Sequence, residues 1–261
     1  MPQVDISQPH WARVYDYWLG GKDNFAADRE AAQQVIEAMP GIIPGVQAQR
    51  AFRGRAVRYL AAEAGIRQFL DIGTGLPAAG NTHEVAQRIA PESRIVYVDN
   101  DPMVLAHARA LLTGSKQGAC AYLHADLHEA KDILAEAERT LDFSLPVAVV
   151  LLGVMQFIPD ADHPAGLVDT LKTAVPPGSH LVLGQPASDV DPVRMADAVT
   201  RLTKLTPEPV TMRTRAEILG FFDDLEMVEP GLVQLPAWRP DPADPPVKGP
   251  VPFWCGVGRK A

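Results

Sequence analysis

The chain has 261 residues, enough for one large α/β domain with a substantial core. Lys and Arg number 24 against 32 Asp and Glu, and the formal net charge of −8 argues against nucleic acid or anionic lipid as the partner. No secretion signal is visible, and the longest apolar run, near residues 145–155, is shorter than the roughly 20 residues that span a bilayer. We therefore expect a cytoplasmic protein that does not insert into membranes.

The first 65 residues predict helices. Apolar residues recur at helical spacing in WARVYDYWL, FAADREAAQQVIEAM and VQAQRAFRGRAVRYLAAEA, and these stretches are separated by GGKDN and PGIIPG. We expect residues 1–65 to form a helical cap and residues 66–261 to form one compact ligand-binding domain.

From residue 69 onward, short apolar runs alternate with helical stretches. The runs are RQFLDI, RIVYVDN, ACAYLHAD, PVAVVLLGV and HLVLGQ. Strands that are apolar throughout and separated by helices indicate a parallel sheet buried on both faces. The closing runs LEMVEPGLVQL and PFWCGVGRK are expected to pair antiparallel. The predicted fold class is α/β, a doubly wound and mostly parallel sheet with a C-terminal antiparallel hairpin and an N-terminal helical cap.

The first predicted strand ends in an acid and a glycine-rich loop, FLDIGTGLPAAG. In doubly wound sheets the ligand binds beside this loop, and Gly73 and Gly75 would let the backbone turn and approach it closely. Together with Ala78, these glycines also fit a dinucleotide fingerprint, which leaves an NAD(P)-dependent oxidoreductase open.

Asp71 separates the two ligand classes. A carboxylate at this strand end would repel a pyrophosphate and attract an α-ammonium group, which favours S-adenosylmethionine over NAD. Asn81 and Glu84 have the spacing of a capping box, so we expect the next helix to begin near Thr82 and residues 76–81 to form an extended loop.

The second predicted strand ends at Asp99, where a carboxylate can accept both ribose hydroxyls. Asn100 and Met103 are expected to flank the adenine. Asp101 followed by Pro102 is instead typical of a helix N-cap with proline at the first helical position.

The third predicted strand ends at Asp126, which can accept from the adenine amine, while the backbone N–H of Leu127 can reach a ring nitrogen. His124 and His128 have a spacing that would converge on a metal only in a helix, and here it straddles a strand end and a loop. We therefore predict no metal site.

The motifs DIGTG, YVDND, HAD and VVLLGVMQFIPD resemble the successive motifs of class I S-adenosylmethionine-dependent methyltransferases. More narrowly, the whole chain resembles the bacterial S-adenosyl methyltransferase family formerly known as a domain of unknown function, including ARVYDYWLGGKDNFAADREAA and FFDDLEMVEPGLVQLPAWRPD. The resemblance implies a Rossmann-like fold and S-adenosyl-L-methionine as cofactor. The sequence departs from the class at Pro77, where the class has a third glycine.

Methyl transfer depends on positioning, and a general base is optional, so no catalytic residue is assigned. Tyr15, Tyr17 and His83 are weak candidates, and the segment YDYWLGGKDN is expected to fold over the cofactor. Further residues expected around the pocket are Asp16, Lys22, Asp23, Asn24, Met155, Gln156 and Phe157.

The leading functional hypothesis is a methyltransferase acting on a small molecule or secondary metabolite. The alternatives are an NAD(P)-dependent oxidoreductase and a non-catalytic protein that binds S-adenosylmethionine as a regulator. The sequence does not indicate an oligomeric state. The predicted cofactor-binding residues are Asp71, Gly73, Gly75, Asp99, Asn100, Met103, Asp126, Leu127 and Gly153.

Overall fold

The computed structural model describes residues 5–111, 114–205 and 210–261. An eight-stranded sheet has the order β3-β2-β1-β4-β5-β8-β6, with β7 also paired to β8. The five parallel strands are β1 (Gln68–Ile72), β2 (Arg94–Asp99), β3 (Ala119–His124), β4 (Ala148–Leu152) and β5 (His180–Pro186). Antiparallel pairing joins β8 (Phe253–Lys260) to β5, to β6 (Leu225–Met227) and to β7 (Val233–Gln234). The predicted mostly parallel sheet with C-terminal antiparallel strands is confirmed.

Helices cover both faces of this sheet because its strands are apolar on both faces. Phe69 packs toward the face covered by α3 (Ile42–Ala62) and α4 (Thr82–Ile89). Leu70 and Ile72 pack toward the opposite face, with α6 (Ala130–Ala137), α7 (Pro164–Ala174) and α9 (Arg215–Gly220). The helix α5 (Pro102–Leu111) follows β2 and contacts β2 and β3. In the described ranges, no helix is long and apolar enough to cross a membrane.

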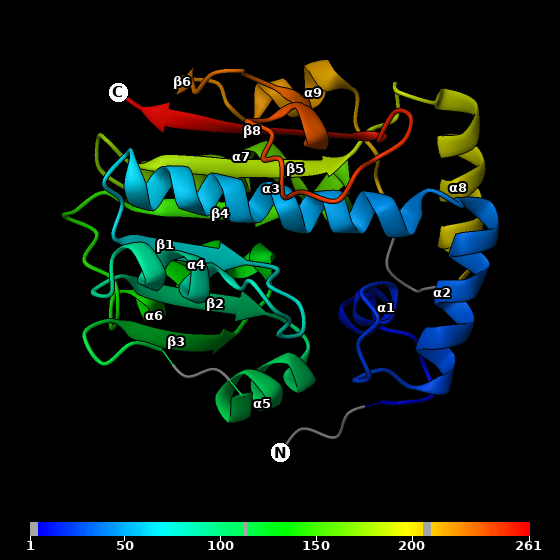
Figure 1. The fold of residues 1–261 in the computed structure, drawn as a ribbon, viewed down its shortest axis with the longest axis horizontal. Coiled ribbons are helices and arrows are strands. Elements are labelled where there is room, and N and C mark those ends of the chain that lie inside the picture. Colours follow the sequence, from blue (N-terminus) through cyan, green and yellow to red (C-terminus); the bar gives the residue numbers. More distant parts are fainter. Residues whose placement is uncertain (1–4, 112–113, 206–209) are drawn as a thin grey trace.

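Three helices gather at the end of the sheet toward which the parallel strands point (Figure 1). They are α1 (Trp11–Trp18), α2 (Ala26–Ala38) and α8 (Pro192–Leu205), and α2 packs against the other two. They share a hydrophobic core of their own that includes Val14, Val35 and Leu202. The third helix of the predicted cap, α3, instead packs along the sheet through Phe52 and Leu60. The helices α1 and α2 thus lie at the strand ends, and α3 is part of the sheet's flank.

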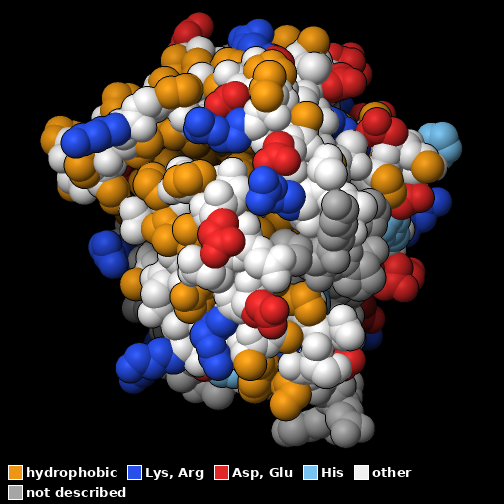
Figure 2. Space-filling view, turned by 90° about the vertical axis from the view of Figure 1, so that its right-hand side faces the viewer, with side chains coloured by type: hydrophobic (Ala, Val, Ile, Leu, Met, Phe, Trp, Pro, Cys, Tyr) orange, Lys and Arg blue, Asp and Glu red, His pale blue; other side chains and the backbone are white. Residues whose placement is uncertain are grey.

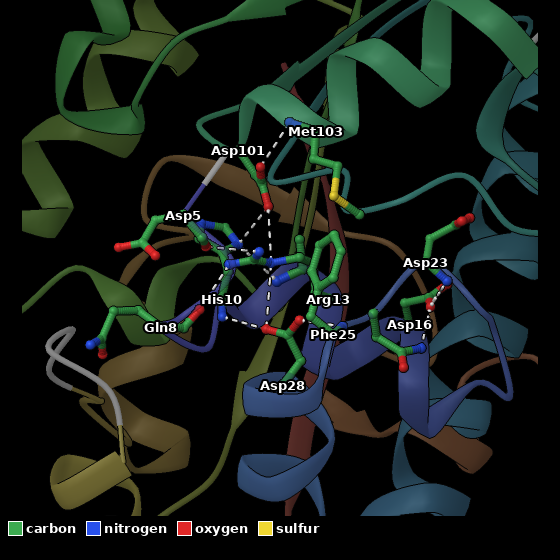
Figure 3. A network of polar contacts seen from close by, with 12 residues as sticks. Asp5, Gln8, His10, Arg13, Asp16, Asp23, Phe25, Asp28, Asp101 and Met103 are labelled. Carbon is green, nitrogen blue, oxygen red and sulfur yellow. Dashed lines mark hydrogen bonds and ion pairs between the residues drawn. The ribbon is translucent and has the colours of Figure 1, made fainter. Parts of the chain in front are cut away.

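A buried polar network holds α1 and α2 against the end of β2 (Figure 3). Arg13 Nε lies 3.4 Å from Asp28 Oδ1 and 3.7 Å from Asp101 Oδ2. Asp28 also accepts hydrogen bonds from the backbone N–H groups of His10 and Phe25, at 2.9 and 2.8 Å. His10 Nδ1 lies 3.1 Å from Asp101 Oδ2. Because Asp101 directly precedes α5, the network fixes the N-terminal helices to the strand end that carries the second predicted acid.

Candidate functional site

A cavity of about 750 Å³ opens at the carboxyl ends of β1, β2 and β4 and extends beneath α1, α2 and α8. Its size lies within the range of about 300–1,000 Å³ that is common for small-molecule sites. Most of the residues that the sequence predicts to bind cofactor line it, namely Asp71, Gly73, Gly75, Asp99, Asn100, Asp126, Leu127 and Gly153.

Met103 is the exception, because the structure does not place it among the described lining residues, and its contact with the adenine stays a prediction. Its side chain is buried in a small cluster with Leu76 and Val104, outside the cavity lining. Its backbone N–H donates to Asp101 Oδ1 at 2.8 Å, which confirms Asp101 as the N-cap of α5.

Asp71 is a buried carboxylate beside cationic groups. It follows Phe69 by two positions, so strand alternation directs it to the α3 face of the sheet. It is 3% exposed, and its Oδ2 accepts a hydrogen bond of 2.6 Å from Thr82 Oγ1. Burial raises the pKa of Asp71, while the charge of Arg53, the Thr82 hydroxyl and the charge of Arg50 oppose that rise.

The two loop glycines meet different needs. Both have positive φ, 73° at Gly73 and 68° at Gly75. A Cβ on Gly73 would lie 2.6 Å from Val154 Cβ, whereas a Cβ on Gly75 would meet nothing within 4 Å. At position 73, glycine is therefore required both by the positive φ and by the close approach of Val154, and at position 75 by the positive φ alone.

Substitution of Gly73 by alanine is expected to destabilise the protein more than the same change at Gly80. Gly80 also has positive φ, at 77°, but a Cβ there would meet nothing within 4 Å. A strained backbone residue costs about 1–3 kcal/mol, and at Gly73 the clash with Val154 adds to this cost. Urea denaturation of Gly73→Ala and Gly80→Ala measures the difference. Equal midpoints would show that the Val154 contact imposes no constraint.

Asp99 links the glycine loop to β2. It is 7% exposed, and it accepts hydrogen bonds from the backbone N–H of Gly75 at 2.8 Å and of Asp101 at 3.0 Å. Burial raises the pKa of Asp99, and these two N–H donors oppose the rise. Each carboxylate oxygen keeps acceptor capacity for one further donor from the cavity.

Two arginines that the sequence analysis did not single out also line the cavity. Arg50 and Arg53 lie one turn apart on α3 and donate to the carbonyls of Ala79 at 2.7 Å and Gly80 at 3.0 Å. Burial and the charge of Arg53 lower the pKa of Arg50 to about 10, so Arg50 remains charged at neutral pH. Arg53 is 7% exposed. A cationic residue at a core-facing position of this helix was the signal by which the sequence could have pointed to Arg53.

These arginines also explain how residues 76–81 are held. The predicted extended loop is confirmed, because α4 begins at Thr82 and Asn81 precedes it as the N-cap. Asn81 Nδ2 and the Gly80 N–H both donate to the Glu84 carboxylate, at 3.1 and 3.0 Å. The loop carbonyls turned toward α3 are the ones that receive the arginine hydrogen bonds.

Neutral side chains connect the cap to the end of β4. The Tyr15 hydroxyl donates to Gln49 Oε1 at 3.3 Å, and Gln156 Nε2 donates to the Gly153 carbonyl at 2.7 Å. Gly153 has a φ of 71°, and a Cβ there would lie 2.5 Å from Gln49 Nε2. Burial raises the pKa of Tyr15, so its hydroxyl is protonated at neutral pH.

His83 and Tyr17, two of the weak catalytic candidates, lie outside the cavity lining. His83 is 3% exposed, its Nδ1 lies 2.8 Å from the Tyr97 hydroxyl, and its backbone N–H donates to the same oxygen. The helix start is packed against β2, and the contacts of His83 join it to Tyr97, outside the cavity lining.

The GGKDN turn is a structural element, and the expectation that its polar residues reach the pocket is wrong. Asp16 Oδ2 accepts from the backbone N–H of Asp23 and from Asn24 Nδ2, both at 2.9 Å. A Cβ on Gly21 would lie 1.9 Å from Asp16 Oδ1, so the turn closes tightly around this carboxylate. Asp16, Lys22, Asp23 and Asn24 do not line the cavity, whereas Tyr15 and Trp18 on α1 do.

The end of β3 forms the rim of the cavity. Asn100 Nδ2 donates to Asp126 Oδ2 at 3.0 Å, and His128 is hydrogen-bonded to Asp126 and lies 3.1 Å from Asp162. Partial burial disfavours the imidazolium, but the bonds to the two carboxylates raise the pKa of His128. His124 Nε2 lies 2.9 Å from the Asn100 carbonyl, so the two histidines have different partners.

Comparison with known proteins identifies the class of site. A family described as S-adenosyl methyltransferase matches residues 1–261. A DUF574 family protein from Streptomyces avermitilis MA-4680 is 40% identical, with a TM-score of 0.96 over 99% of this chain and 100% of that chain. A proposed methyltransferase from Thermobifida fusca YX is also 40% identical, with a TM-score of 0.90 over 99% of this chain and 97% of that chain. No curated protein matches the chain.

The likeness extends to more distant proteins at the level of fold. The N-methyltransferase NodS from Bradyrhizobium japonicum WM9 is 16% identical, with a TM-score of 0.50 over 83% of this chain and 97% of that chain. The findings thus favour a methyltransferase that uses S-adenosylmethionine over both alternatives, the NAD(P)-dependent oxidoreductase and the non-catalytic regulator.

Proposed function

Since the chain belongs to the S-adenosyl methyltransferase family and is an S-adenosylmethionine-dependent methyltransferase, we propose that it methylates a small molecule. The observation that carries the proposal is the division of one cavity. Its half at the strand ends is lined by acids and glycines, and its other half lies beneath helices and is lined mainly by apolar side chains. A cofactor with several polar groups suits the first half, and the second half leaves room for an acceptor.

In this proposal, charge orients the amino-acid part of the cofactor. Asp71 would hold the α-ammonium group, because a buried carboxylate gains most from a cation at close range. Arg50 and Arg53 would hold the carboxylate, since both guanidinium groups line the cavity beside the glycine loop. Gly73 and Gly75 leave the backbone without side chains where it must approach the ligand.

The nucleoside part would lie along the ends of β2 and β3. Asp99 has free acceptor capacity for ribose hydroxyls, and Asn100 and Asp126 form the neighbouring polar wall. Leu127 is 4% exposed and offers an apolar surface to the adenine. These roles follow from the position of each side chain in the cavity lining.

When bound, the cofactor supplies a methyl group on a positively charged sulfur. The protein's contribution is to align the reacting atoms and exclude water, which strengthens the electrostatics of the site. We assign the cover to the cap within residues 1–65, where Tyr15 is a neutral hydrogen-bonding group beside Gly153, and cofactor binding to residues 66–261. Arg50 and Arg53 of α3, which lies within residues 1–65 but packs along the sheet, would add to cofactor binding from that side.

Calorimetric titration tests the proposal. We expect S-adenosylmethionine and S-adenosylhomocysteine to bind in the low-micromolar range, about −8 kcal/mol, and NAD to give no heat of binding. Asp71→Asn, which removes the charge and keeps the shape, should weaken S-adenosylmethionine binding at least tenfold. Binding of NAD without a response to either sulfur-containing ligand would contradict the proposal.

A further inference from the structure

The half of the cavity beneath the helices, here called the acceptor chamber, has an apolar lining that the cofactor does not need. It lies between α1, α2, the start of α3, α8, and the segments that contain Phe157 and Met212. Figure 2 shows the outer surface at this end of the molecule, where basic, acidic and hydrophobic side chains are mixed. The chamber side chains used below are Trp11, Trp18, Phe157, Met39, Met195 and Met212.

Aromatic rings form one wall of the chamber. The ring centroids of Trp11 and Phe157 are 5.3 Å apart with an interplanar angle of 31°, and those of Trp11 and Trp18 are 6.4 Å apart at 46°. Tilted aromatic groups at these distances pack favourably with further rings, whose edges and faces carry opposite partial charge. A ring-bearing molecule therefore gains more in this chamber than a linear polar one.

Methionines form another part of the lining. Met39 and Met195 are buried and share a cluster with Met212, which is partly buried. Unbranched thioether side chains adapt to irregular shapes and make favourable contacts with aromatic rings. This wall suits a bulky molecule and tolerates differences in its outline.

The charged lining residues near the start of α8 and on the loop before β8 have partly or largely exposed side chains. Asp191 and Arg194 are 3.6 Å apart, with side chains 37% and 63% exposed, and Lys248 is also exposed. Deeper among the described lining residues, the polar side chains nearest the end of β4 are Tyr15, Gln49 and Gln156, which are all neutral. The charged neighbours there are Arg50 and Arg53, whose charges act on the Tyr15 hydroxyl. In the proposed function these two arginines hold the cofactor carboxylate, so a charge buried on the acceptor would have no opposite charge left to offset its desolvation.

From these observations we infer that the methyl acceptor is an uncharged, mainly apolar molecule that contains at least one ring. Its apolar body would lie among the side chains of the acceptor chamber, and its reacting atom would face the seam between Tyr15 and Gly153. The inference rests on the proposed function, because it takes the other half of the cavity as the cofactor site.

The neutral aromatic dye N-phenyl-1-naphthylamine serves as the probe, in fluorescence titrations of protein saturated with S-adenosylhomocysteine. We expect saturable binding by the wild type and at least tenfold weaker binding by Met212→Glu, which brings a charge into the chamber. Val210→Phe, which fills the chamber without adding charge, should weaken binding as well. Val193→Glu is the matched control, because Val193 is 85% exposed on α8 and lies outside the lining.

Calorimetry with S-adenosylhomocysteine on the same four proteins separates the two claims. The inference is supported if all four proteins keep their affinity for S-adenosylhomocysteine, and if Met212→Glu and Val210→Phe lose dye binding while Val193→Glu keeps it. If the wild type binds S-adenosylhomocysteine but not the dye, or if neither chamber variant alters dye binding, the inference is wrong and the proposed function stands. Failure of the wild type to bind S-adenosylhomocysteine would overturn the proposed function and the inference with it.

Discussion

Asp28→Ala is expected to lower the free energy of unfolding by about 3–5 kcal/mol, the usual cost of removing one partner from a buried ion pair. Asp28 is fully buried, and its carboxylate faces Arg13, which is 4% exposed. The substitution leaves the Arg13 guanidinium with Asp101 as its remaining carboxylate neighbour and removes the acceptor for the His10 and Phe25 N–H groups. Guanidinium chloride denaturation measures the loss.

Asp197→Ala is the matched control for this prediction. Asp197 lies on α8 and pairs with Arg201 one turn later at 3.0 Å, but both side chains are more than half exposed. Exposed pairs of this kind contribute about 0.3–0.5 kcal/mol, so the control should unfold near the wild-type midpoint. If Asp28→Ala cost no more than Asp197→Ala, the buried network of Figure 3 would not hold the cap to the strand ends.

Asp99→Ala is expected to weaken binding of S-adenosylhomocysteine by about 1.5–3 kcal/mol, the worth of hydrogen bonds to a charged group. The physical reason is twofold. The variant loses the acceptor proposed for the ribose hydroxyls, and it also releases the Gly75 N–H, which the Asp99 carboxylate holds at 2.8 Å. Isothermal titration of the two proteins at the same ionic strength measures the change.

Asp101→Ala separates binding from stability. Asp101 caps α5 through the Met103 N–H and lies 3.1 Å from His10 Nδ1. The Asp101→Ala variant should therefore lose more free energy of unfolding than the about 1 kcal/mol that a helix cap alone contributes. Its affinity for S-adenosylhomocysteine should change less than fivefold. A large loss of affinity in Asp101→Ala with little loss in Asp99→Ala would reverse the roles assigned to these two acids.

The meeting of three acids at one cavity was predictable because sequence order and spatial order coincide at the strand ends. Parallel strands end at one edge of the sheet, so Asp71, Asp99 and Asp126, each at or just after a strand end, line one cavity. The start of α4 at Thr82 was equally local, since the spacing of Asn81 and Glu84 marks it in the sequence. The Asn81 side chain makes no capping hydrogen bond, however, and Glu84 accepts from Asn81 Nδ2 and the Gly80 N–H.

The other features depend on contacts between segments far apart in the chain. Arg53 reaches the glycine loop only because α3 packs along the sheet, and no local pattern gives that placement. The GGKDN turn looked like a pocket element because it combines charges with a glycine pair. The Asp23 N–H and the Asn24 amide instead donate hydrogen bonds to Asp16 within the turn, and this pairing is visible only in the folded structure. The acceptor chamber likewise depends on α2 and α8, which pack together although the strands β1 to β5 lie between them in the sequence.

The central claim is that the cofactor lies across the carboxyl ends of β1, β2 and β3. Hydrogen–deuterium exchange of the intact protein, with and without saturating S-adenosylhomocysteine, tests it most directly. The account predicts slower exchange in peptides that span residues 71–76, 99–103 and 125–128, and no change in residues 225–227, the strand β6 at the far edge of the sheet. Bound ligand that leaves the first three segments unchanged, or protects only residues outside the cavity lining, would contradict it.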